Sequence, residues 1–152
     1  MKLAIASDHA GVDIKAMLRD TLRAEGHEVL DLGTHDYASC DYPDYAALAA
    51  SKVAQGEVER AVLICGTGVG MAIAANKIRG VRAASVSEPV SAGLARSHND
   101  ANIVCLGARI VGPEMALEIV RVFLSTPFSN GERHARRVAK IIKLDDARQR
   151  EP

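Results

Sequence analysis

Cys65 begins a glycine-rich segment, Cys65-Gly66-Thr67-Gly68-Val69-Gly70. The segment leaves an apolar run and enters a stretch of helical period, so its glycines allow backbone N–H groups to turn toward an anion beside a helix N-terminus. The same surroundings favour the thiolate form of Cys65, which acts as a base or a nucleophile. These residues predict a proton-transfer or nucleophilic centre with an anion hole. The alternative is a tight turn around a buried, inert cysteine.

The glycine segment does not match the standard nucleotide-binding motifs. It is one residue short of a phosphate-binding loop with Gly-Lys-Ser, and no lysine follows its last glycine. Its third glycine comes too early for a dinucleotide fingerprint, and the segment follows the third expected strand instead of the first. ATP and NAD are therefore not expected as ligands, and no cofactor is predicted.

Two further polar clusters border expected strands. Asp8 and His9 follow the first strand, where Asp8 can serve simply as a helix cap, and an imidazole can bind phosphate or exchange protons near pH 7. His98 and Asn99 precede the fifth strand. A lone histidine in that position is more often structural, so a catalytic and a structural reading both stay open.

A pair of arginines in the last expected helix has the spacing of a phosphate site. Arg133 and Arg137 are four residues apart, share one helix face and can converge on one phosphate. Arg136 and Lys140 extend the positive charge, and a solvated basic face is the alternative. Arg109, after the fifth strand, is another candidate phosphate ligand, because ligands bind outside the carboxyl ends of parallel strands.

The elements that must position these residues alternate between strand and helix. Short apolar runs separated by longer segments of helical period predict an α/β fold: a Rossmann-like three-layer αβα domain with a five-stranded parallel sheet and an extra C-terminal helix. The expected strands are Leu3–Ala6, Glu28–Asp31, Ala61–Ile64, Val81–Val86 and Ile103–Leu106. The expected helices are a segment from about Ile14 to near Gly26, then Tyr42–Ala54, Val69–Asn76, Pro89–Ser97, Pro113–Leu124 and Glu132–Ala147.

The bulk composition bounds the class of protein. A chain of 152 residues predicts one domain over residues 1–152, with a peripheral tail from about residue 145. The 19 basic and 19 acidic side chains cancel, which argues against nucleic-acid and membrane-surface partners. Three scattered cysteines without ligand spacing argue against a disulfide framework and a metal site, and the start has no signal-peptide pattern. A cytoplasmic protein is expected.

The motifs taken together resemble ribose-5-phosphate isomerase type B over Met1 to about Leu144. The matching segments are Ser7-Asp8-His9-Ala10-Gly11, Asp41-Tyr42-Pro43, Cys65 to Gly70 with Ala75-Asn76-Lys77, Ser87-Glu88-Pro89, His98-Asn99-Asp100 and Arg133-His134. Members without the cysteine use a glutamate beyond the loop. Here Met71 follows Gly70, so the chain resembles the cysteine version of the family.

The resemblance implies a metal-free and cofactor-free isomerase acting on a small-molecule sugar phosphate. It implies a homodimer or a dimer of dimers with active sites at the subunit interface. Cys65 would move the proton between C2 and C1, and the N–H groups of Gly66 to Gly70 would form the anion hole.

The resemblance also implies roles for the remaining residues. Thr67 would help shuttle protons at the substrate oxygens, His98 would open the sugar ring, and Asp8 would orient the sugar hydroxyls. The implied contacts to substrate are made by Tyr42 beside the ring, Asn99 at the enediolate, His9, Arg133 and Arg137 at the phosphate, and Arg109 across the dimer.

Two rival functions follow from the same residues. Relatives that act on allose 6-phosphate or galactose 6-phosphate share the fold, so a six-carbon substrate is the first alternative. A non-catalytic module that binds phosphate or a nucleotide on a flavodoxin-like fold is the second. It predicts ligand binding without proton exchange from solvent into the sugar.

Overall fold

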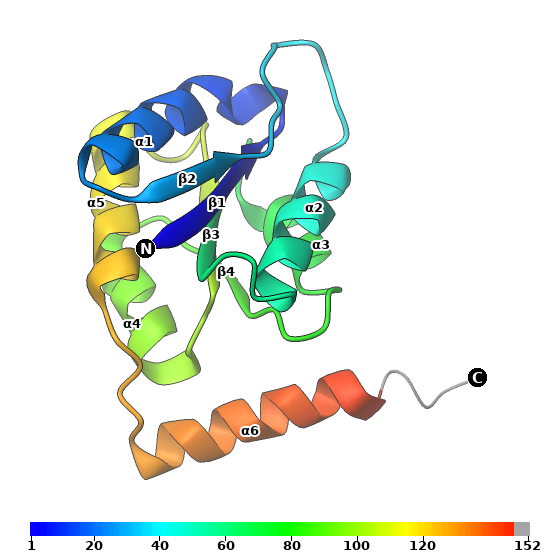
Figure 1. Ribbon diagram of the computed structural model, residues 1–152, viewed down its shortest axis with the longest axis vertical. Coiled ribbons are helices and arrows are strands. Elements are labelled where there is room, and N and C mark those ends of the chain that lie inside the picture. Colours follow the sequence, from blue (N-terminus) through cyan, green and yellow to red (C-terminus); the bar gives the residue numbers. More distant parts are fainter. Residues whose placement is uncertain (148–152) are drawn as a thin grey trace.

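Five parallel strands form the centre of the molecule (Figure 1). The computed structural model describes residues 1–147. The strands are β1 (Lys2–Ser7), β2 (Glu28–Asp31), β3 (Arg60–Cys65), β4 (Ala83–Ser85) and β5 (Ile103–Gly107), in the order β2-β1-β3-β5-β4. The predicted Rossmann-like α/β fold with a five-stranded parallel sheet is confirmed.

Helices connect the strands and cover both faces of the sheet. They are a 3₁₀ turn (His9–Gly11), α1 (Val12–Ala24), α2 (Tyr42–Ala54), α3 (Val69–Ala75), α4 (Pro89–Asn99), α5 (Pro113–Ser125) and α6 (Glu132–Ala147). Alternate side chains of each strand face opposite cores. Leu3 and Ile5 pack toward α1 and α5, whereas Ala4 and Ala6 pack toward α2 and α3. The predicted three layers and the extra C-terminal helix are therefore present.

The edge strand β4 is shorter than the apolar run that predicted it. The expected strand was Val81–Val86, but only Ala83–Ser85 is extended and paired as a strand. The N–H of Val81 closes a turn onto the carbonyl of Ile78 at 3.2 Å. The N–H of Arg82 donates to the side chain of Asn102 at 2.8 Å. An apolar side chain can enter the core from a turn, so the apolar run alone predicted a strand that was too long.

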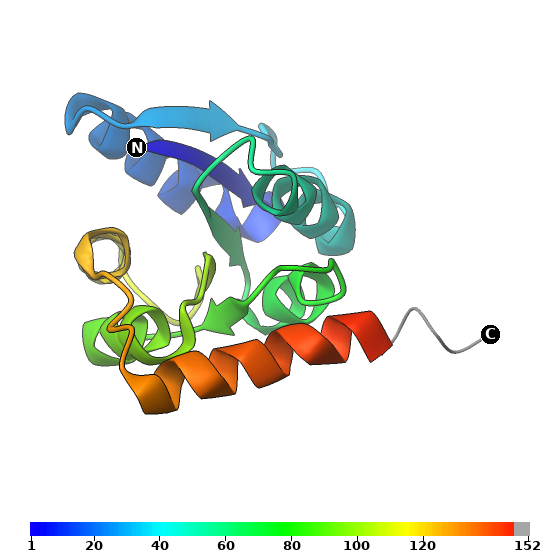
Figure 2. The ribbon, with the colours of Figure 1, turned by 60° about the horizontal axis from the view of Figure 1, so that its bottom comes forward.

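Helix α6 lies below the rest of the molecule, against α4 (Figure 2). Its apolar stripe is only partly covered by its own chain: Val138 is 7% exposed, whereas Ile141 and Ile142 are 40% and 44% exposed. The tail was expected to be peripheral from about residue 145, yet Asp145 accepts the N–H of Gly80 at 2.9 Å. Residues 148–152 lie outside the described residues. Within residues 1–147, no helix has the length and apolar character needed to cross a membrane.

Candidate active site

The carboxyl ends of β1, β3 and β5 meet at one edge of the sheet. Cys65 on β3 pairs with Gly107 on β5, and Ser7 on β1 pairs with Ile64 on β3. Asp8 follows β1 directly, and its N–H donates to the Ile64 carbonyl at 3.1 Å. The side chains expected behind these strands therefore gather where parallel sheets bind ligands.

Cys65 is held in a loop whose backbone turns back onto its sulfur. The side chain is 4% exposed, and Sγ accepts the N–H of Gly68 at 3.2 Å. This contact aims a donor at the atom that carries the charge of a thiolate. At the nearby Cys105, complete burial, and then the proximity of Cys65, raise the pKa of the thiol far above the usual range. Cys105 is therefore a neutral packing residue.

Two glycines of the loop have no room for a side chain. Gly68 adopts a left-handed conformation with φ 79°, and a Cβ there would lie 2.9 Å from the carbonyl carbon of Leu106. A Cβ at Gly70 would lie 2.6 Å from Cζ of Tyr42. Tyr42, at the start of α2, thus lies directly on the loop, where the resemblance places it beside the sugar ring.

Thr67 and Arg109 flank the same loop. Thr67 is exposed, and its Oγ1 accepts the N–H of Val69 at 3.3 Å, which leaves the hydroxyl hydrogen for a ligand. The N–H of Arg109 donates to the Gly66 carbonyl at 3.1 Å. Its guanidinium lies 3.3 Å from the position that a Cβ of Gly66 would take. Within one chain, Arg109 lies beside the Cys65 loop, and its contribution across a dimer, which the resemblance implies, stays a prediction.

Asp8 and His9 have defined hydrogen-bond partners. Asp8 caps the 3₁₀ turn, since its Oδ1 accepts the N–H of Ala10 at 2.9 Å, so the capping role considered from the sequence is confirmed. The second carboxylate oxygen is not used by the cap. His9 Nδ1 accepts the N–H of Cys40 at 3.3 Å. The neutral His9 ring then carries its proton on Nε2, which becomes a donor suited to phosphate.

A second cluster gathers on α4 and α6. His98 and Asn99 form the last residues of α4, which ends two residues later than the sequence suggested. The rings of His98 and His134 lie 4.1 Å apart between centroids, with 36° between their planes. Partial burial, and then the proximity of His98, Arg133 and Arg137, lower the pKa of His134. His134 thus lies beside His98 and the arginine pair.

His134 was not among the expected site residues. Its Nδ1 lies 2.8 Å from Ser129 Oγ, and Arg133 approaches Nε2 at 3.3 Å. Arginine only donates, so Nε2 accepts and the ring proton resides on Nδ1, facing Ser129. The sequence shows that His134 adjoins Arg133. It does not show that the ring contacts His98, which is distant in the chain.

The two clusters lie at opposite ends of the sheet in one chain, because the Cys65 loop follows the carboxyl end of β3 whereas the end of α4 lies near its amino end. The carbonyl of Asn102, just beyond α4, accepts the N–H of Ala61 at the amino end of β3. Cys65 stands four residues further along that strand, which is about 13 Å at the usual rise per residue. The structure therefore assembles the Cys65 cluster and the His98 cluster separately and does not bring them together within the chain.

No group of three or more His, Cys, Asp or Glu side chains among residues 1–147 is arranged to hold a metal ion. The three cysteines are free thiols. Independence of a metal or cofactor stays a prediction.

The fold and the loop belong to a class of sugar-phosphate isomerases that interconvert aldoses and ketoses. A family model described as Ribose/Galactose Isomerase matches residues 3–141, and the chain belongs to this family. Ribose-5-phosphate isomerase B of Escherichia coli is 46% identical over 147 residues, covering 97% of this chain and 98% of that protein. A galactose-6-phosphate isomerase subunit of Clostridium acetobutylicum is 40% identical over 128 residues, covering 84% of this chain and 74% of its own length.

Solved structures agree with this assignment. Ribose-5-phosphate isomerase B of Clostridium thermocellum superimposes with a TM-score of 0.95 at 47% identity, covering 97% of this chain and 99% of that one. The Mycoplasma genitalium enzyme of the same name, solved with bound ribulose 5-phosphate, gives a TM-score of 0.91 at 43% identity, with 95% and 96% coverage.

Proposed function

We propose that the chain interconverts ribose 5-phosphate and ribulose 5-phosphate through a cis-enediolate, a step of the non-oxidative pentose phosphate pathway. The observation that carries the proposal is Cys65 itself: its sulfur lies in a glycine loop at a strand end, with the N–H of Gly68 directed at it. The relatives named ribose-5-phosphate isomerase B support the choice of substrate. The ribulose 5-phosphate bound in the Mycoplasma genitalium structure supports it as well.

In the proposed reaction, Cys65 acts as the base. Its thiolate takes the proton from C2 of the open-chain aldose, and the electron pair moves into the C1–C2 bond while O1 gains negative charge. Loop N–H groups between Gly66 and Gly70 stabilise that charge, and Thr67 relays a proton between O1 and O2. Cys65 then returns its proton to C1, which gives the ketose and restores the thiolate.

The other predicted residues open the ring and hold the phosphate in this proposal. His98 protonates the ring oxygen of the cyclic sugar while Asp8 orients the hydroxyls and accepts the complementary proton. Tyr42 and Asn99 border the sugar. The phosphate is held by His9, Arg109, Arg133 and Arg137. Charge-assisted contacts to the phosphate position the reacting carbons at the Cys65 loop.

The substrate is tested by comparing kcat/KM for ribose 5-phosphate, allose 6-phosphate and galactose 6-phosphate with one preparation. We expect ribose 5-phosphate to give the highest value. The galactose-6-phosphate isomerase subunit at 40% identity favours a six-carbon sugar phosphate as the second candidate, and a higher kcat/KM for a hexose phosphate would establish it instead. Ligand binding without any exchange of solvent deuterium into the sugar would support the non-catalytic alternative.

We further propose a homodimer, or a dimer of dimers, in which one subunit's Cys65 cluster meets the His98 cluster of another. The separation of the two clusters within one chain supports this arrangement. Exposed apolar side chains on α3, on α4, after β5 and on α6 offer the surface for it. These are Val69, Ile73, Val90, Leu94, Ile110, Ile141 and Ile142.

Subunit complementation tests the shared site. Cys65→Ala and His98→Asn chains should each be nearly inactive alone. Unfolded together in equal amounts and refolded, half of the dimers would be mixed, and each mixed dimer would hold one intact site out of two. Activity should therefore recover to about a quarter of the wild-type level. No recovery, with mixed dimers demonstrated by mass spectrometry, would place the complete site within one chain.

We also propose that the chain forms a single domain and is located in the cytoplasm. Residues 1–152 would act as one isomerase domain. The free thiols of Cys40, Cys65 and Cys105 support a reducing cytoplasm as its location.

A further inference from the structure

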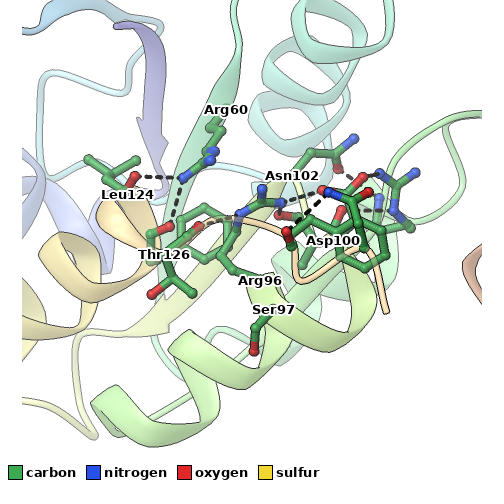
Figure 3. A network of polar contacts seen from close by, with 12 residues as sticks. Arg60, Arg96, Ser97, Asp100, Asn102, Leu124 and Thr126 are labelled. Atoms are coloured by element: carbon green, nitrogen blue, oxygen red, sulfur yellow. Dashed lines mark hydrogen bonds and ion pairs between the residues drawn. The ribbon is translucent and has the colours of Figure 1, made fainter. Parts of the chain in front are cut away.

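Asp100 ends α4, and its carboxylate binds two arginine side chains, which an ordinary helix end does not do. It adopts the left-handed conformation, with φ 47° and ψ 41°. Arg96 Nη1 donates to its Oδ1 at 2.8 Å, and Arg82 Nη2 donates to its Oδ2 at 2.8 Å (Figure 3). The two arginines come from different elements, since Arg96 belongs to α4 and Arg82 precedes β4. We call this arrangement the Asp100 clamp.

The clamp also reaches the segment that leads into α6. Arg96 is 6% exposed and donates to the carbonyls of Ala101 at 2.6 Å and Thr126 at 3.4 Å (Figure 3). The N–H of Ser129 donates to the carbonyl of Ser97, one residue after Arg96, at 3.1 Å. The last turn of α4 and the start of α6 are therefore fixed to each other, close to where the rings of His98 and His134 meet.

We propose that Asp100 is a positioning residue for His98. The proposal rests on the proposed function, in which His98 opens the sugar ring. A left-handed helix end is commonly made by a lone glycine or asparagine, without ion pairs. Here both oxygens of one carboxylate hold two arginines, two residues after the ring that must be aimed. The function of the clamp is to set the direction of His98 relative to α6.

Removing the carboxylate changes the surroundings of His98 without touching its ring. Arg82 and Arg96 would face each other without their common counter-ion, and a partly buried charge left unpaired is strongly unfavourable. The last turn of α4 would move to relieve this, and His98 would move with it. A displacement of about 1 Å can cost on the order of 100-fold in a rate that depends on orientation.

Deuterium exchange separates positioning from a purely structural role. Ribulose 5-phosphate cannot form a five-membered ring, because the hydroxyl it would need carries the phosphate. Exchange of solvent deuterium into C1 of ribulose 5-phosphate therefore needs the Cys65 step but no ring opening or closing. A misplaced His98 should lower kcat/KM for isomerisation equally in both directions, because the equilibrium constant fixes their ratio, and should lower the rate of this exchange much less.

The test variant is Asp100→Gly, because glycine keeps the left-handed backbone and removes both carboxylate contacts. We expect kcat/KM for isomerisation to fall by about tenfold more than the rate of deuterium exchange into ribulose 5-phosphate, which is about 1.4 kcal/mol at ring opening. The circular dichroism spectrum should match that of the wild type. Arg82→Lys, a milder change in the same clamp, should shift the same ratio and serves if Asp100→Gly does not fold.

Two controls make the outcomes distinct. Arg60 also lies in this network and donates to the carbonyls of Phe123 and Leu124, each at 2.8 Å, without contacting Asp100 (Figure 3). Arg60→Met should lower the melting temperature and leave the ratio of isomerisation to deuterium exchange unchanged. His98→Asn should show the largest change in that ratio.

Equal losses of isomerisation and of deuterium exchange for Asp100→Gly, or no loss, would overturn the positioning role. An unchanged ratio of isomerisation to exchange in His98→Asn, or an absence of isomerisation by the wild type, would instead refute the proposed function on which it rests.

Discussion

Replacing Cys65 with alanine separates its chemistry from its packing. The side chain is buried between the sheet and helices α2 and α3, so the variant loses one sulfur from a packed core. Such a small truncation costs about 1 kcal/mol, well below the total stability of a domain. Cys65→Ala should therefore fold, with a melting temperature lower by about 2–4 °C for a chain of this size.

The catalytic loss should be far larger than the loss of stability. Without the thiolate no group in the loop accepts the C2 proton, so isomerisation should fall by several orders of magnitude while ribose 5-phosphate still binds. Cys65→Ser should be nearly as poor, because an unactivated hydroxyl is a much weaker base. Some relatives with serine compensate with an acid after the loop, but here Met71 occupies that place. The assay is kcat in both directions, with binding measured by calorimetry.

Alkylation tests the reactivity of the Cys65 thiol independently of catalysis. Iodoacetamide should modify Cys65 faster than Cys40 and faster than Cys105, because burial raises the pKa of Cys105. Bound ribose 5-phosphate should protect Cys65 from this modification. Mass spectrometry ranks the three sites. If Cys65→Ala kept more than about a tenth of wild-type kcat, less than about 1.4 kcal/mol of barrier lowering would depend on the thiol. The reasoning would then be refuted, and Asp8 would be the next candidate base.

Three further expectations follow. Arg137→Ala should raise KM about tenfold or more with a smaller effect on kcat, because the phosphate contact exists in both ground and transition states. An unchanged KM would mean that this helix face is only exposed to solvent and does not bind the phosphate. Activity should survive dialysis against a chelator, and loss that a divalent ion restores would contradict metal independence. Burial raises the pKa of Asp31, but hydrogen bonds from Lys15, then the N–H of Gly33 and Arg19, outweigh it and hold this pKa below its usual value. The Asp31 carboxylate thus stabilises the fold above pH ~4 and loses that effect as the pH falls through the lowered pKa. Asp31→Asn should lower the melting temperature at pH 7, because it leaves the buried Lys15 with a weakened partner. The melting temperature of the variant should also fall less steeply in acid than that of the wild type. Parallel curves of melting temperature against pH for the two proteins would refute this.

Alternating patterns predicted the fold well because they report burial directly. Runs such as Ala61–Ile64 are apolar throughout, as strands covered on both faces must be, and the structure extends this one by one residue at each end. Helix ends were less certain, since α4 continues two residues beyond the expected Ser97. The stop is set by the left-handed Asp100, whose arginine partners are side-chain contacts that no local pattern shows.

The candidate site was predictable where its residues follow strands. Asp8 and Cys65 belong together because parallel strands carry their following residues to one edge. The same rule predicted Arg109 at this edge, but its contact with Gly66 was not predictable, since it depends on how a long side chain lies. The contact between His98 and His134 joins two helices that are separate in the sequence, so periodicity within either one gives no sign of it.

The separation of Cys65 from His98 along the sheet has a consequence for how activity depends on concentration. On the proposed arrangement, a lone chain can fold completely and still lack a working centre. Specific activity should then decline on dilution as paired chains dissociate, while substrate that bridges two chains should hold them together by mass action. The association equilibrium would thereby act as a threshold on catalysis that no property of the isolated chain reveals.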